Sequence, residues 1–140
     1  MSRAAVLSAL RYDNDLADFV EPQNIIVNYS QEGRPSNLAP EAFIILRWEE
    51  TSTNPGVDSV IRVLTVWAHY PAEKSTDYSR IDEILTNVKR ILTGMEHVAG
   101  VDGYTVTCIE YQGDSSDLKD DAFNTISRNS TYKVLSRASA

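Results

Sequence analysis

The feature that most constrains this fold is an amphipathic helix predicted in the middle of the chain. Across residues 76–93 the apolar side chains recur at steps of three and four, which places them on one face of a helix. The members of this stripe are Ile81, Ile84, Leu85, Val88, Ile91 and Leu92, and Met95 continues it. Ser75 or Thr76 can cap the first turn, and Gly94 can end the helix. Such a helix needs another layer to cover its apolar face.

Strands are predicted on both sides of that helix. Residues 43–50 and 60–70 are rich in β-branched and aromatic side chains, and a polar stretch with a Pro-Gly pair separates them, which indicates a β-hairpin. Residues 60–70 are apolar on both faces, as in a central strand. Residues 104–111 and 125–135 are predicted to form two further strands.

The first forty-one residues give a weaker pattern. Apolar side chains at roughly helical spacing predict a helix within residues 2–20, broken near Asp13, and residues 25–29 are a candidate edge strand. The expected fold is therefore α+β, in the order α-β-β-α-β-β. Helices would pack on one face of a mainly antiparallel sheet of four strands or slightly more. We expect one domain over residues 1–140, with an N-terminal helix and connection at 1–41 and an α+β core at 42–137.

Charge and composition narrow the functional classes. The net charge of −7 would repel a phosphate backbone, so tight binding of nucleic acid is not expected. The longest apolar runs, such as residues 43–46 and 63–68, are far shorter than the roughly 20 residues of a membrane span. The start of the chain does not resemble a secretory signal, and Cys108 is the only cysteine. We therefore expect an intracellular chain without an internal disulfide.

The residue types that usually carry chemistry form no recognisable motif. His69 and His97 lack partners at metal-ligand spacing, and Cys108 alternates along a strand face as a small hydrophobic residue would. Nucleophile-elbow, phosphate-loop and dinucleotide-binding patterns are missing from the sequence. The aspartates of residues 113–121 lack the spacing and glycine of a calcium loop, which favours a solvated acidic loop. We therefore predict no catalytic residue, no metal and no cofactor.

Several short phrases occur in a particular order along the chain. A strand ends in VWAHYP at residues 66–71, and DYSRID at residues 77–82 opens the amphipathic helix. An acidic loop, GDSSDLKDD at residues 113–121, precedes NTISR at residues 124–128 and YKVL at residues 132–135. In this order, and over residues 42–137, the chain resembles the tail terminator proteins of long-tailed, non-contractile bacteriophages. The first forty residues fit that family's leading helix and connection only loosely.

The resemblance implies a structural role and not an enzymatic one. Proteins of that family form a ring, commonly of six subunits, that sits on the finished tail tube, stops its polymerisation and presents the surface that joins the head. The implied partners are further copies of the chain, the major tail tube protein and a head-completion or connector protein. DNA would pass through the lumen only as cargo, and no membrane is involved. The implied location is the virion tail, after synthesis in the host cytoplasm.

The acidic segment at residues 113–121 is the candidate interface. Its composition predicts a mobile loop in the free subunit, and we expect it to become ordered against a neighbouring subunit or the tube. The candidate interface residues are Asp114, Asp117, Asp120, Asp121 and Arg128.

Two other readings remain open. Another small neck component of the same kind of particle, such as a tail-completion or head-closure protein, would have a similar size and equally little chemistry. A small intracellular α+β enzyme or a ligand-binding module would need a site that the sequence does not reveal.

Overall fold

The computed structural model describes residues 3–27, 41–53 and 59–139. The helical elements in these residues are α1 (Arg3–Arg11), α2 (Asn14–Ala17), the 3-10 helix η1 (Pro22–Asn24) and α3 (Ser79–Thr93). The strands are β1 (Ile25–Val27), β2 (Phe43–Thr53), β3 (Ser59–Pro71), β4 (Val98–Ala99), β5 (Tyr104–Asp114), β6 (Leu118–Asp120) and β7 (Thr125–Ala138). The predicted long helix and the four predicted strands are therefore α3, β2, β3, β5 and β7.

One curled, mixed sheet contains all of these strands. Their order is β1-β2-β3-β7-β5-β4, and β6 pairs with β7 beside the end of β5. All pairings are antiparallel except that of β1 with β2, which is parallel. The α+β class is confirmed. The prediction of a mainly antiparallel sheet of four strands or slightly more is confirmed in part, since the described residues form seven strands and one pairing is parallel. β1 lies within the candidate edge strand at 25–29, whereas β4 and β6 have only two and three residues and leave no period in the sequence.

The N-terminal helical segment is divided into α1 and α2, and the break falls near Asp13, as predicted. The carboxylate of Asp13 accepts a hydrogen bond from the backbone N–H of Leu16 at 2.9 Å, which caps α2 and separates it from α1. Leu10 and Leu16 are both buried. The apolar spacing thus identified the helical residues, while the cap at Asp13 set the break between the two helices.

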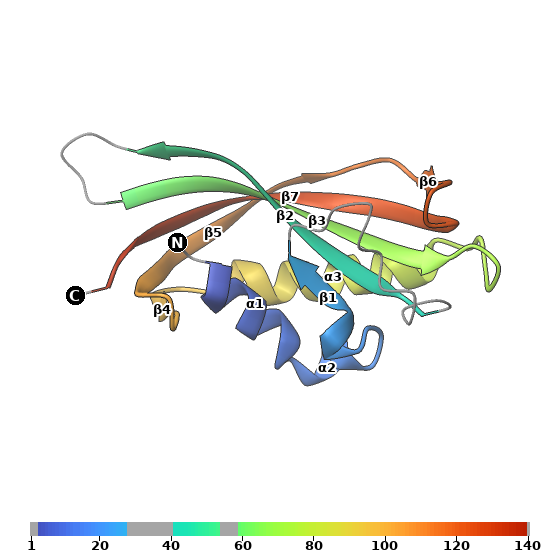
Figure 1. The fold of residues 1–140 in the computed structure, drawn as a ribbon, viewed down its shortest axis with the longest axis horizontal. Helices are drawn as coiled ribbons and strands as arrows, with labels where there is room; N and C mark the ends of the chain where they lie inside the picture. The colour runs from blue at the N-terminus through green and yellow to red at the C-terminus, as the bar shows by residue number, and fades with distance from the viewer. Residues whose placement is uncertain (1–2, 28–40, 54–58, 140) are drawn as a thin grey trace.

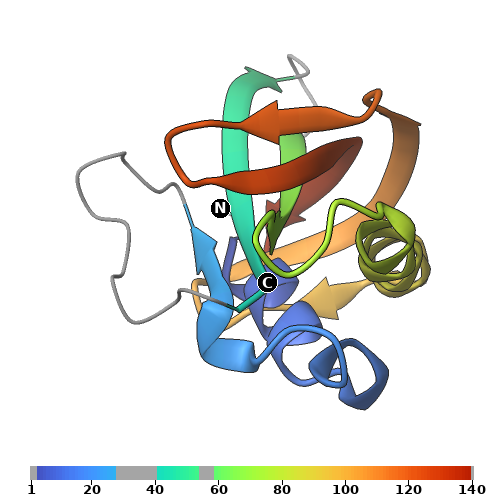
Figure 2. The same ribbon diagram turned by 90° about the vertical axis from the view of Figure 1, so that its right-hand side faces the viewer.

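The helices lie on one face of the sheet, as expected. Figure 1 shows α1, α2 and α3 on the same side of the long strands, with α3 running along the sheet's length, and Figure 2 shows the sheet curling round α3. The predicted α3 stripe is buried, and Leu85 is 4% exposed. On the sheet, Leu64, Val66 and Tyr132 belong to the same buried cluster. The predicted packing of this helix on the sheet is confirmed.

A second, smaller cluster lies outside this core. Phe43 and Phe123 are buried against each other, with a distance of 5.5 Å between ring centroids. The His69 ring stacks on Phe43 at 4.6 Å, and its Nδ1 lies 2.8 Å from the hydroxyl of Thr125. This cluster ties the turn before β7 to strands β2 and β3.

No helix within residues 3–27, 41–53 and 59–139 is long and apolar enough to cross a membrane.

Candidate functional site

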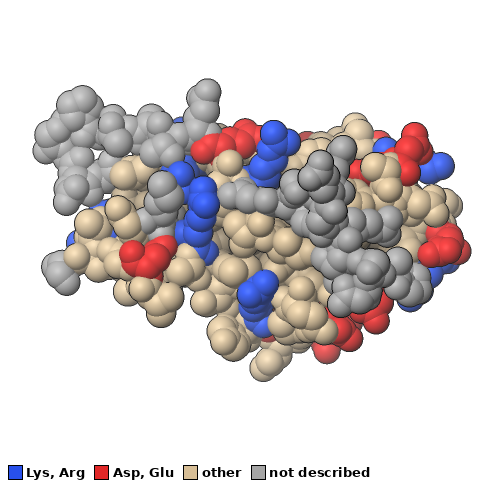
Figure 3. Space-filling model, viewed as in Figure 1, with Lys and Arg blue, Asp and Glu red and all other residues tan. Residues whose placement is uncertain are grey.

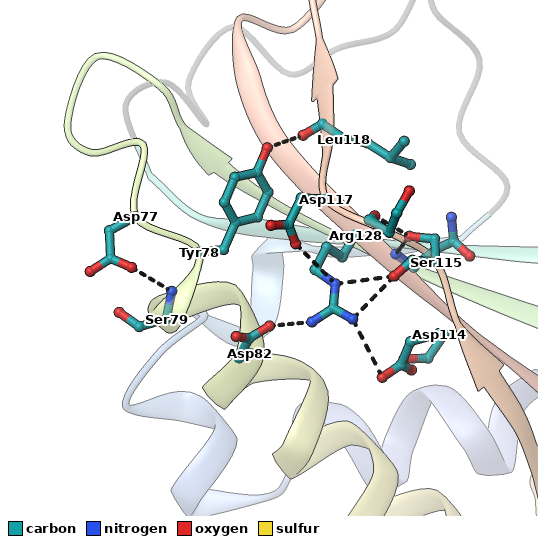
Figure 4. A network of polar contacts seen from close by, with 12 residues as sticks. Asp77, Tyr78, Ser79, Asp82, Asp114, Ser115, Asp117, Leu118 and Arg128 are labelled. Carbon is teal, nitrogen blue, oxygen red and sulfur yellow. Dashed lines mark hydrogen bonds and ion pairs between the residues drawn. The ribbon is translucent and has the colours of Figure 1, made fainter.

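The most connected polar group on the described surface is the guanidinium of Arg128 in β7. Its Nε and Nη2 donate hydrogen bonds to the Ser115 carbonyl at 3.2 and 3.1 Å. Its Nη1 pairs with the carboxylate of Asp82 from the first turn of α3. Asp117 lies 3.5 Å from Nε, and Asp114 lies 3.8 Å from Nη2. Figure 4 shows the guanidinium at the centre of these groups.

The chain around Ser115 is shaped to reach this guanidinium. A register shift between Tyr111 and Gly113 bends β5, and Gly113 takes a positive φ of 137° that favours glycine. The Ser115 N–H then donates to the Asn129 carbonyl at 2.8 Å, and the Asn129 N–H donates to Oγ of Ser115 at 3.0 Å. These bonds hold the link between β5 and β6 against β7.

Helix α3 supports the same link from its N-terminal end. The hydroxyl of Tyr78 donates to the Leu118 carbonyl at 2.5 Å, so the residue before α3 contacts β6 directly. Together with the Asp82–Arg128 pair, this bond joins the start of the helix to the edge of the sheet. The Arg128 network therefore connects α3, β5, β6 and β7.

The expected loop at residues 113–121 needs correction. Gly113 and Asp114 end β5, and Leu118–Asp120 forms β6, so much of the segment is strand. Composition alone indicated a loop because short polar strands resemble turns in sequence. Pairing of Leu118 with Ser127 on β7 overrides that local preference.

Charges in the Arg128 network are unbalanced. One guanidinium, with its side chain 21% exposed, faces the carboxylates of Asp82, Asp114 and Asp117. Nearby, burial raises the pKa of Tyr111, and its hydrogen bond with Asp114 raises that pKa further. The ammonium of Lys89 sits 4.0 Å from the centroid of the Tyr111 ring. An excess of negative charge thus remains at this end of the molecule.

The five predicted interface residues fall into two groups. Asp114, Asp117 and Arg128 meet in the Arg128 network. Asp120 instead accepts from the Phe123 N–H at 3.0 Å and shapes the turn after β6, while Asp121 has a side chain that is 93% exposed. Their role as an interface stays a prediction.

Sequence reasoning missed Asp82 as a member of the network. Its place in the first turn of a helix was fully explained by the helix dipole, so nothing in the sequence pointed to a distant partner. Arg128 lies in the first, mainly apolar and hydroxylic part of β7, and this was the available signal, since a cation there needs a carboxylate from elsewhere in the fold.

The two histidines and the cysteine are not part of the Arg128 network. His69 is buried in the aromatic cluster, His97 occupies a turn with a positive φ of 52°, and Cys108 is half-buried on β5. Within the described parts of the chain, no group of three or more His, Cys, Asp or Glu side chains is arranged to hold a metal ion.

A surface hollow of about 270 Å³ lies between α2, η1 and the segment before α3. It is lined by Phe19 and Tyr70 together with side chains of both charges, including Glu41, Lys74 and Arg80. Its volume is slightly below the roughly 300–1,000 Å³ of typical small-molecule sites. Arg80 already stacks on Phe19 at 4.7 Å, which occupies part of the aromatic surface that a ligand would use.

The molecule thus has an α+β fold, and the most developed feature of its described surface is an ion-pair network. A scan against models of protein families finds no match, and a search of curated proteins finds no relative. Among solved structures, the fold is similar to a chain of the virion of a native gene transfer agent particle, with a TM-score of 0.70. The match covers 99% of this chain and 100% of that chain, at 10% sequence identity. At so low a sequence identity, the similarity shows that the two chains share a fold and nothing more.

Proposed function

We propose that this protein is a structural component of a phage-like virion and acts there as a tail terminator. The single observation that carries the proposal is the full-length fold similarity to a chain of a gene transfer agent virion. The order of sequence phrases that resembles the tail terminator family adds independent support, because it was recognised from the residues alone. A structural role also accords with the Arg128 network, whose polar groups are engaged with one another.

In this role, copies of the chain form a ring on the finished tail tube. The ring, of six subunits by analogy with the family, stops further tube polymerisation and offers a surface to a head-completion or connector protein. A repeated heterologous contact produces such a ring when its rotation closes. DNA passes through the lumen, and the chain's negative charge disfavours retention of that DNA on the wall.

Deletion of the coding sequence from the genome that produces the particle tests this function. We expect tails of uncontrolled length without attached heads, and restoration of normal tails when the intact chain is supplied. Tail length is measured by negative-stain electron microscopy.

The same experiment separates the alternatives. Tails of normal length that fail to join heads would indicate a neck or head-closure protein. Particles that assemble normally would refute a structural role and favour an enzyme or a ligand-binding module.

A further inference from the structure

The helix-free face of the sheet is more apolar than an exposed sheet face normally is. On β3, Leu64 and Val66 point into the core, so Ile61, Val63 and Trp67 point to the opposite face. Leu135 of β7 lies beside Ile61 on that face, and all four are partly exposed. Antiparallel sheets with one face in water usually carry polar side chains there. We call these four residues the outer sheet face.

The two central strands make the outer sheet face regular. β3 and β7 pair without any register shift from Ser59 to Pro71. The strands beside them, β2 and β5, contain register shifts, after Trp48 and within residues 106–113. A regular apolar centre is therefore available on the face.

The charges around the outer sheet face differ in sign from the rest of the molecule. Cross-strand register places Arg47, Lys133 and Arg137 on this side together with Glu110, and the Glu49 carboxylate lies 3.9 Å from Nε of Arg47. Among the described side chains, these three cations and two carboxylates leave a small positive excess, in a chain whose net charge is −7. An apolar centre with a charged rim is the usual composition of a protein interface.

Negatively charged side chains gather at the end of the molecule where α3 begins and β6 lies. Figure 3 shows acidic side chains collected at that end. Six aspartates lie around the Arg128 network, where Arg128 pairs with Asp82, Asp114 and Asp117 and Lys119 pairs with Asp121. We call them the acidic end; its members are Asp77, Asp82, Asp114, Asp117, Asp120 and Asp121.

We propose that the outer sheet face of one copy receives the acidic end of the next copy. This inference rests on the proposed function and names the contact from which the ring is built. Ile61 and Leu135 pair near the start of β3 and the end of β7. Figure 1 shows these strand ends at the opposite end of the long axis from β6, so the contact joins two different surfaces, head to tail. Contacts of this type close into rings or continue as filaments. Apolar burial supplies the attraction, and the opposite charges select the orientation.

A charge-reversal experiment tests the pairing of these surfaces. One variant carries Asp117→Lys and Asp121→Lys, whose parent side chains are 61% and 93% exposed. A second carries Arg47→Glu and Arg137→Glu, and a third combines all four changes. Self-association is measured by analytical ultracentrifugation at low salt, and urea unfolding reports whether each monomer remains folded.

Each two-site variant should associate at least tenfold more weakly than the parent, which corresponds to about 1.4 kcal/mol of association free energy. The association constant of the four-site variant should recover to within about threefold of the parent value. Trp67→Ser should also weaken association at least tenfold. Tyr12→Ser is the matched control, because Tyr12 is 84% exposed on the helical side, and it should change nothing.

Failure of the four-site variant to recover would overturn the proposal, as would a parent that stays monomeric at its highest soluble concentration. Binding of the outer sheet face to purified tube protein instead of to itself would also overturn it. None of these results would alter the tail-length phenotype of the deletion, so failure of this contact is distinguishable from failure of the proposed function.

Discussion

Replacement of Arg128 by alanine should destabilise one end of the subunit more than any other exposed charge change. A hydrogen bond from a charged group contributes about 1.5–3 kcal/mol, and the two bonds to the Ser115 carbonyl share one acceptor, so we count them once. Each exposed ion pair adds about 0.2–1 kcal/mol. Because such contributions are not additive, we expect Arg128→Ala to lower the free energy of unfolding by about 2–4 kcal/mol.

Urea denaturation measures this change, and amide hydrogen exchange locates it. Exchange at Ser115 and Asn129 should accelerate, because their mutual hydrogen bonds hold the link that Arg128 anchors. In 1 M salt, where the screening length is about 3 Å, the difference between variant and parent should shrink but persist, since the bond to Ser115 survives screening.

Two variants serve as references for Arg128→Ala. Arg128→Lys keeps the positive charge but loses the planar set of guanidinium N–H donors, so it should be more stable than Arg128→Ala and less stable than the parent. Arg137→Ala removes an exposed arginine from the same strand and should stay within about 0.5 kcal/mol of the parent. If Arg128→Ala is no more destabilising than Arg137→Ala, the network does not hold this end together.

Three further predictions concern stability, each measured by urea denaturation. Leu85→Ala should cost about 2–5 kcal/mol because the side chain is 4% exposed beneath the sheet, and a cost below about 1 kcal/mol would contradict that packing. A hydrogen bond from Arg90 lowers the pKa of Asp13, so its stabilisation is present above the unfolded-state pKa of about 3.9 and is lost as pH falls through the lower folded value. Asp13→Asn keeps the helix cap and should therefore destabilise by up to about 1 kcal/mol at pH 7 but not at pH 2, whereas an equal effect at both values would exclude the ion pair as the cause. His69→Phe should cost about 1–3 kcal/mol by leaving the buried Thr125 hydroxyl without its 2.8 Å contact, and an unchanged stability would show that this contact contributes nothing.

The long elements were predictable because their periods extend over many residues. The α3 stripe repeats over several turns, and β3 keeps apolar side chains along its length, so local sequence and burial agree. β6 was not predictable as a sheet member, since three residues cannot display a period, and its pairing depends on neighbours supplied by the fold. β1 coincides with the first three residues of the candidate edge strand at 25–29, whose residues 28–29 lie outside the described part of the chain.

The candidate site was only partly predictable for a related reason. The sequence identified the aspartates of residues 113–121, together with Arg128, as candidates. Their closeness along the chain does not determine which of these side chains contact one another in the fold. The bend at Gly113 turns Asp114 and Asp117 towards Arg128, while Asp120 is engaged in its own turn. Asp82 joins from a helix some distance away in sequence, through packing that only the complete fold provides.

Electron microscopy of purified virions, with the chain carrying a small labelled C-terminal tag, tests directly whether the protein acts as a tail terminator. We expect the label as a single ring at the head-proximal end of every tail and nowhere else on the particle. Label distributed along the tube, on the capsid, or absent from complete virions would contradict it.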